Sequence, residues 1–233
     1  MTPTALPGKR PPLTRATVLA AAVALADTSG IETLSMRNLA RDLGVVAMAL
    51  YKHIANKEEL LDGMVEAVIA EFDPPAQTGD WAADLRERIL SARRTMLRHP
   101  WAAQVFAGRP APTPAVLAHL DSVAAGMLAG GLSPALTHQG LHMLGSLIWG
   151  FHLEVFPSGP PPQDPAEREE MMIGFAAAYP AVLTVAMAAS HDPAAIVGAG
   201  CDDQAEFELT IDLVLDGLKR LHEAGWPAKS RKS

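Results

Sequence analysis

Apolar residues recur at helical intervals through the first part of the chain. Leu19, Val23 and Ala26 follow one another at spacings of four and three residues, which places them on one face of a helix. Thr14 is a typical residue before the first turn of such a helix, and Gly30 a typical residue after its last turn. The pattern therefore predicts an amphipathic helix from residue 14 to about residue 28.

Three shorter helical segments are predicted next. Ser35 is the expected cap of a helix over 36–43, and Gly44 is the expected turn before a third helix over about 46–53. Asn56 is the expected cap of a fourth helix, which a pair of prolines ends. The apolar stripe of this fourth helix consists of Leu61, Val65, Val68 and Phe72.

The rest of the chain alternates between apolar helical patterns and proline-rich joints. Further helices are predicted over 81–98, 114–129, 134–156, 166–178, 181–190 and 203–222. The segment 157–165 contains five prolines and is predicted to be a loop. Because alanine and leucine dominate and only 5% of residues are aromatic, the composition favours helix over strand. The predicted fold class is all-α.

Charge is distributed unevenly along the chain, whose net charge is −7. Residues 1–57 contain seven lysines and arginines against three acids, so this head carries +4 and the remainder carries −11. A basic head on an acidic body can bind phosphate without the body adhering to it. The single cysteine, Cys201, excludes an internal disulfide and fits a reducing cytoplasm.

No membrane partner is expected, because no stretch reaches the roughly 18 apolar residues that a membrane span requires. One alternative concerns the N-terminus, where Lys9, Arg10 and Arg15 precede the apolar run 16–26. This order superficially matches a secretory signal. We favour a helix instead, because the motif described next needs this segment as a packing partner.

Residues 36–55 fit a helix-turn-helix motif with a physical reason at each key position. Ala40 is small where two helices cross, and Gly44 can adopt the positive φ of the tight turn. Leu50 points back and holds the third helix against the first two. The exposed face of that helix can then lie in a DNA major groove.

The stretch LSMRNLARDLGVVAMALYKHIANKEELLDGM, from Leu34 to Met64, resembles the DNA-binding region of the tetracycline-repressor (TetR) family. The resemblance covers residues 14–72. It implies a homodimer with nine or ten helices in each subunit and a small-molecule pocket in the C-terminal domain. The implied organisation is a flexible arm (1–12), a helix-turn-helix DNA-binding domain (13–56), a connecting helix (57–73), a helical ligand-binding and dimerisation domain (80–224) and a tail (225–233).

The resemblance also implies which residues contact DNA. Arg37 matches an arginine that reads guanine or contacts phosphate. Tyr51 and Lys57 match phosphate contacts, and His53 matches a histidine near the DNA backbone. The predicted DNA-binding set is Arg37, Ala47, Met48, Tyr51, Lys52, His53 and Lys57.

Two members of this set depart from the family pattern. Ala47 and Met48 fall where relatives place base-reading side chains, and both are apolar. They can contact thymine methyl groups but cannot make bidentate hydrogen bonds to bases. We therefore expect Arg37 and Lys52 to supply most of the polar readout.

The second half resembles the tetracycline-repressor branch more weakly. GRPAP at 108–112 is similar to its Arg-Pro turn beside the ligand, LGSLIWGFHLEVF at 144–156 to its dimer helix, and FELTIDLVLDGLKRL at 207–221 to its last helix. Two stripes on the long helices are expected at a dimer interface: Leu141, Leu144, Gly145 and Ile148, then Phe207, Ile211, Val214 and Leu218. The predicted ligand-binding set is Trp101, Phe106, Arg109, Pro110, His142, Trp149, His152, Glu154, Met171 and Phe175.

Where that branch places a metal-binding histidine, four residues before Arg109, this chain has Val105. Glu154 does match the branch's acidic position. The missing histidine argues against a magnesium-chelated tetracycline as the effector. No metal and no cofactor is therefore predicted, and the expected effector is a small organic molecule.

Enzymatic alternatives have little support in the sequence. His138 and His142 stand four residues apart and could share a metal, but no third ligand is placed beside them. His152 and Glu154 could form an acid/base pair, although a polar role in an interface or pocket is favoured. No nucleophile elbow or phosphate-binding loop is present.

The predicted function is a cytoplasmic repressor that binds a palindromic operator as a homodimer and is released by a small organic effector. Two alternatives are a ligand-independent DNA-binding regulator and a helical enzyme.

Overall fold

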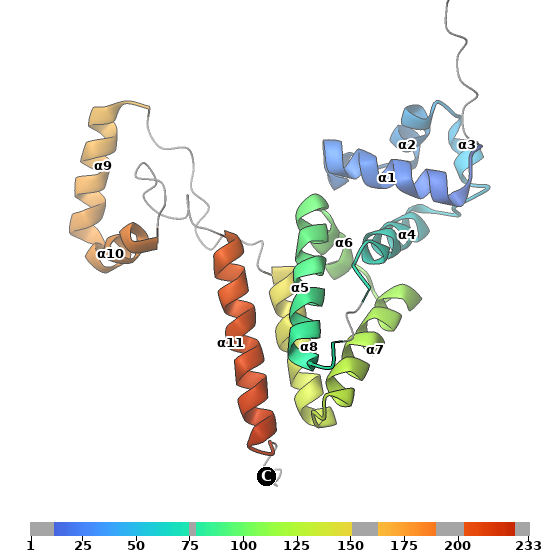
Figure 1. Cartoon of the computed structure of the whole chain (residues 1–233). Coiled ribbons are helices and arrows are strands. Elements are labelled where there is room, and N and C mark those ends of the chain that lie inside the picture. The colour runs from blue at the N-terminus through green and yellow to red at the C-terminus, as the bar shows by residue number, and fades with distance from the viewer. Residues whose placement is uncertain (1–11, 75–77, 151–162, 190–202, 227–233) are drawn as a thin grey trace, which may run out of the picture. The chain divides into compact units, whose positions relative to one another are not determined.

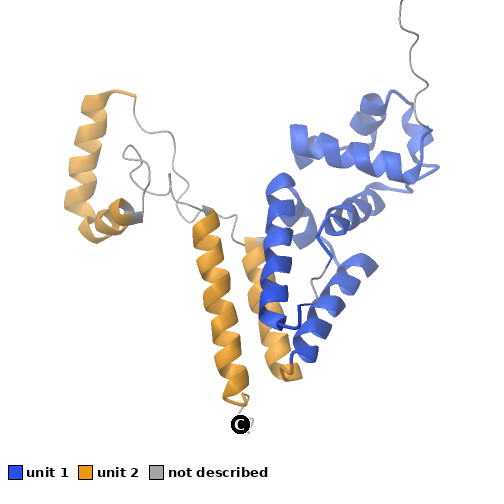
Figure 2. Cartoon of the chain, viewed as in Figure 1, with its two compact units in different colours: residues 1–130 blue, residues 131–233 orange. Residues whose placement is uncertain are grey.

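The computed structural model describes residues 12–74, 78–150, 163–189 and 203–226, and every regular element within these ranges is a helix. The prediction of an all-α fold is confirmed. The contacts divide the chain into two compact units, residues 1–130 and 131–233 (Figure 2). Most of the predicted arm and most of the predicted tail lie outside the described residues.

The first unit contains seven α-helices and one short 3₁₀ turn within its described residues (Figure 1). In chain order they are α1 (Arg15–Ser29), η1 (Ile31–Thr33), α2 (Met36–Leu43), α3 (Ala47–Leu50), α4 (Lys57–Ala70), α5 (Trp81–Arg98), α6 (Ala102–Ala107) and α7 (Pro114–Ala129).

The helix starts predicted from capping residues are confirmed. The side chains of Thr14, Ser35 and Asn56 accept hydrogen bonds from backbone N–H groups in the first turns of α1, α2 and α4. Gly44 ends α2 with φ 63° and ψ 38°, in the left-handed region that favours glycine. The helix-turn-helix geometry is thus encoded locally.

One helix is shorter than predicted. The α-helix of α3 covers only Ala47–Leu50, whereas the sequence pattern predicts a helix over about 46–53. The N–H groups of His53 and Ile54 both donate to the carbonyl of Leu50, at 2.8 and 3.0 Å. This shared acceptor tightens the segment into a turn, so Tyr51 lies just past the helix end.

The helices α1 to α3, which we call the reader, have their core where α1 packs against α2 and α4. Leu39, Leu50, Leu60 and Met64 are fully buried or nearly so, as are Val18 and Ala22 on α1. Gly63 allows the close approach of α1 to α4, because a Cβ there would lie 2.6 Å from Cδ2 of Leu19. The reader is therefore fixed directly to the helix that leads out of it.

The remainder of the first unit is built around α5, which packs against α7, while α4 contacts α5, α6 and α7. Asp80 caps α5 and Thr113 caps α7, each through its side chain. The short helix α6 was not predicted. It begins directly after the Pro100–Trp101 turn and is only six residues long, too short to show helical periodicity in the sequence.

Within its described residues the second unit contains α8 (Pro134–Gly150), α9 (Pro165–Ala178), α10 (Pro180–Ala189) and α11 (Asp203–Glu223). α8 packs against α11. The side chains buried on these two helices include Leu136, Leu144, Phe207, Ile211, Leu215 and Leu218. Four of the eight residues expected to face a partner subunit are thus already buried within one chain.

α11 also presents a second apolar row. Leu209 and Leu213 stand one helical turn apart and are 61% and 63% exposed. Within the described residues, no helix is long and apolar enough to cross a membrane.

Candidate functional site

Five of the seven predicted DNA-contacting side chains are exposed. Arg37 on α2 and Lys57 at the start of α4 are exposed, as is Lys52 in the turn after α3. Met48 is 71% exposed and Tyr51 46% exposed.

Ala47 and His53 are half-buried. Ala47 begins α3, and His53 stands in the turn that follows it. With the exposed residues they form what we call the reader surface: Arg37, Ala47, Met48, Tyr51, Lys52, His53 and Lys57. Their contact with DNA stays a prediction, which the side-chain exposure supports.

The start of α4 is tied to the reader by polar contacts. Glu59 accepts a hydrogen bond from the N–H of Ala55 at 2.7 Å and lies 3.7 Å from the guanidinium of Arg15 on α1. The side chain of Asn56 accepts from the N–H of Glu59 at 2.8 Å. These contacts connect the start of α4 to α1 and to the turn that precedes α4.

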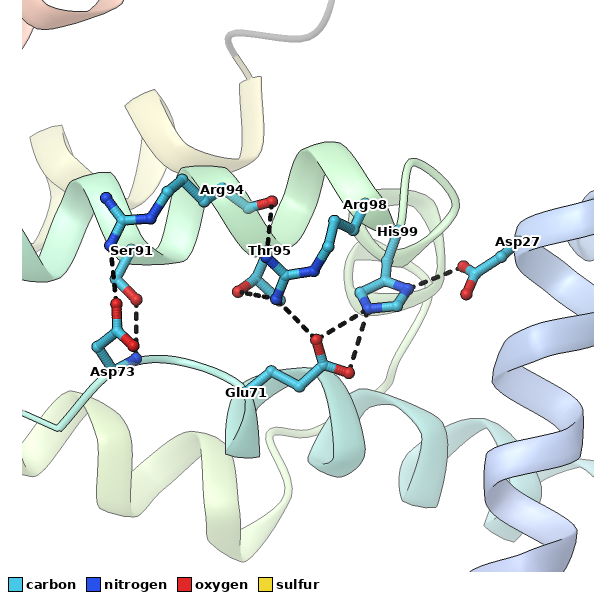
Figure 3. Close-up of polar contacts among 8 residues, drawn as sticks. All are labelled: Asp27, Glu71, Asp73, Ser91, Arg94, Thr95, Arg98 and His99. Atoms are coloured by element: carbon cyan, nitrogen blue, oxygen red, sulfur yellow. Dashed lines mark hydrogen bonds and ion pairs between the residues drawn. The ribbon is translucent and has the colours of Figure 1, made fainter.

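The far end of α4 is held by three consecutive residues, Glu71, Phe72 and Asp73, which we call the α4 exit (Figure 3 shows two of them). Asp73 accepts a hydrogen bond from Arg94 at 2.7 Å, and its N–H donates to the hydroxyl of Ser91 at 2.7 Å. The ring of Phe72 stands edge-on to His119 on α7, with centroids 5.1 Å apart. The α4 exit thus contacts both α5 and α7.

Glu71 is the most connected residue of the α4 exit. Arg98 donates to its carboxylate at 2.8 Å, and Nε2 of His99 lies 3.2 Å from the same oxygen. Partial burial works to raise the pKa of Glu71, but the hydrogen bonds and charges of Arg98 and His99 outweigh it and lower that pKa. Glu71 is therefore ionised at neutral pH.

His99 joins the α4 exit to the reader (Figure 3). Its Nδ1 lies 2.8 Å from Oδ1 of Asp27 near the end of α1, and Nε1 of Trp101 donates to the same oxygen at 2.7 Å. His99 is 6% exposed. The two ring nitrogens of His99 thus face two carboxylates, those of Asp27 and Glu71.

Arg109 makes a second bridge from the α6–α7 joint to α4. Its Nε donates to Asp62 at 2.7 Å, and its Nη1 donates to Glu58. These carboxylates outweigh the effect of partial burial and raise the pKa of the guanidinium. Arg109 and the preceding short helix are therefore anchored on α4 in the described conformation.

A cavity of about 500 Å³ lies between α5 and α7, within the range of small-molecule sites. Apolar and small residues predominate in its lining. It consists of Gly79, Trp81, Asp84, Leu85, Arg88, Ser122, Val123, Ala125, Gly126, Met127, Ala129 and Gly130. All twelve belong to the first unit.

Residues of the predicted ligand-binding set lie elsewhere. Trp101, Phe106, Arg109 and Pro110 are not among the residues that line this cavity. Trp101 is buried against Asp27, Phe106 is half-buried on α6 and Pro110 is exposed. Their role in ligand binding stays a prediction.

The other members of that set belong to the second unit. His142 is exposed on α8 with its ring against His138, and Met171 and Phe175 are exposed and half-buried on α9. His152 and Glu154 lie outside the described residues, as does the side chain of Trp149. Among the described residues, no group of three or more histidine, cysteine, aspartate or glutamate side chains is placed to hold a metal ion.

Sequence reasoning missed Arg88 in the cavity and Asp27, Glu71 and His99 around the α4 exit. Arg88 had a detectable signal, since it interrupts the apolar face that Leu85 and other buried residues form on α5. The polar cluster had none, because its members are 28 to 72 residues apart in the chain.

Comparisons with known proteins agree with this geometry. Residues 18–64 match the tetR family of bacterial regulatory proteins, and residues 73–222 match the tetracyclin repressor-like C-terminal domain. A helix-turn-helix transcriptional regulator of Saccharopolyspora erythraea is 38% identical over 127 residues, which is 54% of each protein. The chain thus matches about half the length of that relative.

Two further proteins are similar over most of the chain. The class C tetracycline repressor protein of Escherichia coli is 32% identical over 219 residues, covering 90% of this chain and 92% of the relative. The structure of Streptomyces coelicolor ActR in complex with actinorhodin is 26% identical with a TM-score of 0.68, covering 90% of this chain and 98% of that one. The chain therefore belongs to the tetR family of transcription regulators, and is not an enzyme.

Proposed function

We propose that the protein is a repressor that binds a palindromic operator as a homodimer and releases it when a small organic effector occupies its C-terminal domain. As a regulator of bacterial DNA, it acts in the cytoplasm. The observation that carries the proposal is the position of α4. This helix is anchored to the exposed reader surface at one end and, through the α4 exit, to the helices that wall the cavity at the other.

Similar proteins support both repression and the binding of an organic effector. The similar Escherichia coli protein is a tetracycline repressor, and the similar ActR is found in complex with actinorhodin. A protein of this chain's family with a cavity of about 500 Å³ has room for an organic effector. The predicted loss of the metal-binding histidine at Val105 supports an effector that binds without a chelated metal.

The homodimer is supported by the second unit. α8 and α11 already form a packed pair within one chain, and Leu209 and Leu213 remain exposed on α11. A partner's equivalent helices would cover this apolar row and complete a four-helix interface. A two-fold dimer carries two reader surfaces, which accounts for a palindromic operator.

Effector binding can release DNA only if the effector prefers the conformation that does not bind DNA. A tenfold loss of operator affinity requires about 1.4 kcal/mol of such preference. The direct contacts of α4 with α5, α6 and α7 supply a physical route for that coupling. By linkage, the operator must weaken effector binding by the same factor.

The experiment that tests the proposal begins with operator selection from a random duplex library, using the full chain. We expect a palindromic sequence to be enriched and bound far more tightly than random duplex. A variant with Arg37, Tyr51 and Lys57 all replaced by alanine should lose this binding while melting at the same temperature as the wild type. Normal operator binding by that variant would contradict the proposed reader surface.

A further inference from the structure

The cavity between α5 and α7 contains an arginine whose charge is not neutralised by a neighbouring carboxylate. Arg88 lies on α5 and belongs to the cavity lining. Its Nη1 donates to the hydroxyl of Ser122 at 2.9 Å, and its Nη2 lies 3.4 Å from Nδ1 of His119. Its Nε is buried and has no hydrogen-bond partner among the residues that the structure describes.

The partners that Arg88 does have are neutral. Burial, and then the charge of Arg88, lower the pKa of His119 to about 4, so its ring is uncharged at neutral pH. Its Nδ1 can therefore accept a hydrogen bond from the guanidinium. Ser122 offers only a hydroxyl. Neither group compensates the positive charge.

The nearest acidic lining residue is already engaged. Asp84 precedes Arg88 by four residues on α5, but its two carboxylate oxygens accept hydrogen bonds from Thr78. The N–H of Thr78 donates to both oxygens at 3.1 Å, and the hydroxyl donates to Oδ1 at 2.6 Å. A partly buried guanidinium without a carboxylate partner is costly unless an anion completes its shell.

The other lining residues indicate the shape and polarity of the rest of the ligand. Leu85, Val123 and Met127 are apolar, and small residues on α7 leave a smooth wall. Gly130 allows the indole of Trp81 to pack tightly, because a Cβ at position 130 would lie 2.5 Å from Cγ of that ring. An indole face beside small side chains suits a flat apolar body.

We propose that this cavity binds a flat, mostly apolar organic acid whose single carboxylate pairs with Arg88. The proposal rests on the proposed function, since it names the class of its effector. A planar carboxylate matches the paired N–H groups of a guanidinium. One charge is favoured over two, because Arg88 is the only cationic residue among the described lining residues and Asp84 would repel a dianion.

Binding at Arg88 also reaches the α4 exit. A carboxylate on the guanidinium competes with Ser122 and His119 for its N–H groups. His119 in turn contacts Phe72 edge-on, with ring centroids 5.1 Å apart. Binding of the acid should therefore alter the contact between His119 and Phe72, which joins α7 to the end of α4.

The experiment measures binding of matched pairs of probes to the full chain by calorimetry at neutral pH. The probes are benzoate, 2-naphthoate and anthracene-2-carboxylate, each beside its neutral carboxamide. The variants are Arg88→Gln, which removes the charge, and Arg88→Lys, which keeps the charge without the planar fork. Arg94→Gln is the control, because Arg94 lies on the same helix but pairs with Asp73 outside the cavity.

We expect the wild type and Arg94→Gln to bind at least one two-ring or three-ring acid at least tenfold more tightly than its amide. Arg88→Gln should lose that difference while binding the amide unchanged, and Arg88→Lys should keep part of it. If Arg88→Gln does not fold, which its melting curve would show, the acid-to-amide ratios of the wild type and Arg88→Lys carry the test.

Equal binding of acids and amides, an acid preference that survives in Arg88→Gln, or no binding of any acid would each overturn the proposal. Operator binding is measured in parallel on the same samples. If the wild type does not bind the operator, the proposed function is contradicted. If it binds the operator but shows no preference for acids, only the proposed class of effector is contradicted.

Discussion

Two residues of the reader surface, Ala47 and Met48, have no hydrogen-bonding side chain where relatives are expected to read bases. Met48 is 71% exposed, so its thioether is free to contact thymine methyl groups. Polar recognition is then left to the exposed cations of the same surface. Substitutions at single residues can separate base reading from phosphate contact.

Lys57→Ala should weaken binding to the operator and to unrelated duplex by the same factor. Lys57 is exposed at the start of α4, and a phosphate contact carries no sequence information. The slope of log affinity against log salt concentration, measured by fluorescence anisotropy, should become less steep by about 1. Lys219→Ala on α11 is the control and should leave the slope unchanged. An unchanged slope in Lys57→Ala would exclude this residue as a phosphate contact.

Asp27→Asn should lower stability by about 1–3 kcal/mol, because one carboxylate oxygen serves both His99 and Trp101 inside the protein. Denaturant unfolding measures the change. Asp121→Asn, at an exposed position on α7, is the control and should change stability by less than about 0.5 kcal/mol. If both variants were equally stable, the hydrogen bonds of Asp27 with His99 and Trp101 would contribute nothing measurable to the free energy of unfolding.

At the scale of elements, the reader depends on the turn between α2 and α3. Gly44 adopts φ 63°, where a side chain is unfavourable. Gly44→Ala should therefore cost about 1 kcal/mol or more, and it should weaken operator binding further by displacing α3. Unfolding and operator titration on the same sample measure both effects. A variant as stable as the wild type would show that the turn adopts another conformation.

The buried ring of His119, which joins α7 to the α4 exit, should make stability depend on pH. The folded-state pKa of His119 is about 4, whereas a histidine in the unfolded chain titrates near 6.5. Between these values the unfolded chain binds a proton that the folded chain excludes. This contribution to stability is complete above about pH 6.5 and is lost as the pH falls toward 4.

His119→Gln should remove this part of the pH dependence. The test is unfolding at a series of pH values between 7 and 4, with the slope of the variant compared with that of the wild type. His138→Gln, on exposed residue 138 of α8, provides the matched control. Identical slopes for the wild type and His119→Gln would contradict the burial of this ring.

Local signals account for what could be predicted from the sequence. Thr14, Ser35 and Asn56 cap helices because each interaction lies within one turn of chain, and Gly44 marks a turn for the same reason. The bridge from Asp27 through His99 to Glu71 depends on the packing of three helices. No spacing in the sequence encodes such a contact, and this is also why Arg109 could not be assigned to its partners on α4.

At the scale of the whole molecule, the exposed row on α11 should matter for assembly. Leu209→Arg together with Leu213→Arg should convert a dimer into a monomer, because two charges would be buried without partners at the interface. Sedimentation at micromolar concentration distinguishes the two states. The control pair, Leu117→Arg and Leu120→Arg on α7, replaces exposed leucines of the first unit. A wild-type monomer would contradict the proposed homodimer.

Release of DNA by an occupant of the cavity is tested most directly by one titration. The affinity of the wild type for its selected operator is measured by anisotropy with and without a saturating amount of the acid that binds most tightly. We expect the acid to weaken operator binding at least tenfold in the wild type, and to have no such effect in Arg88→Gln. An operator affinity unchanged by an acid known to be bound would contradict a repressor controlled through this cavity.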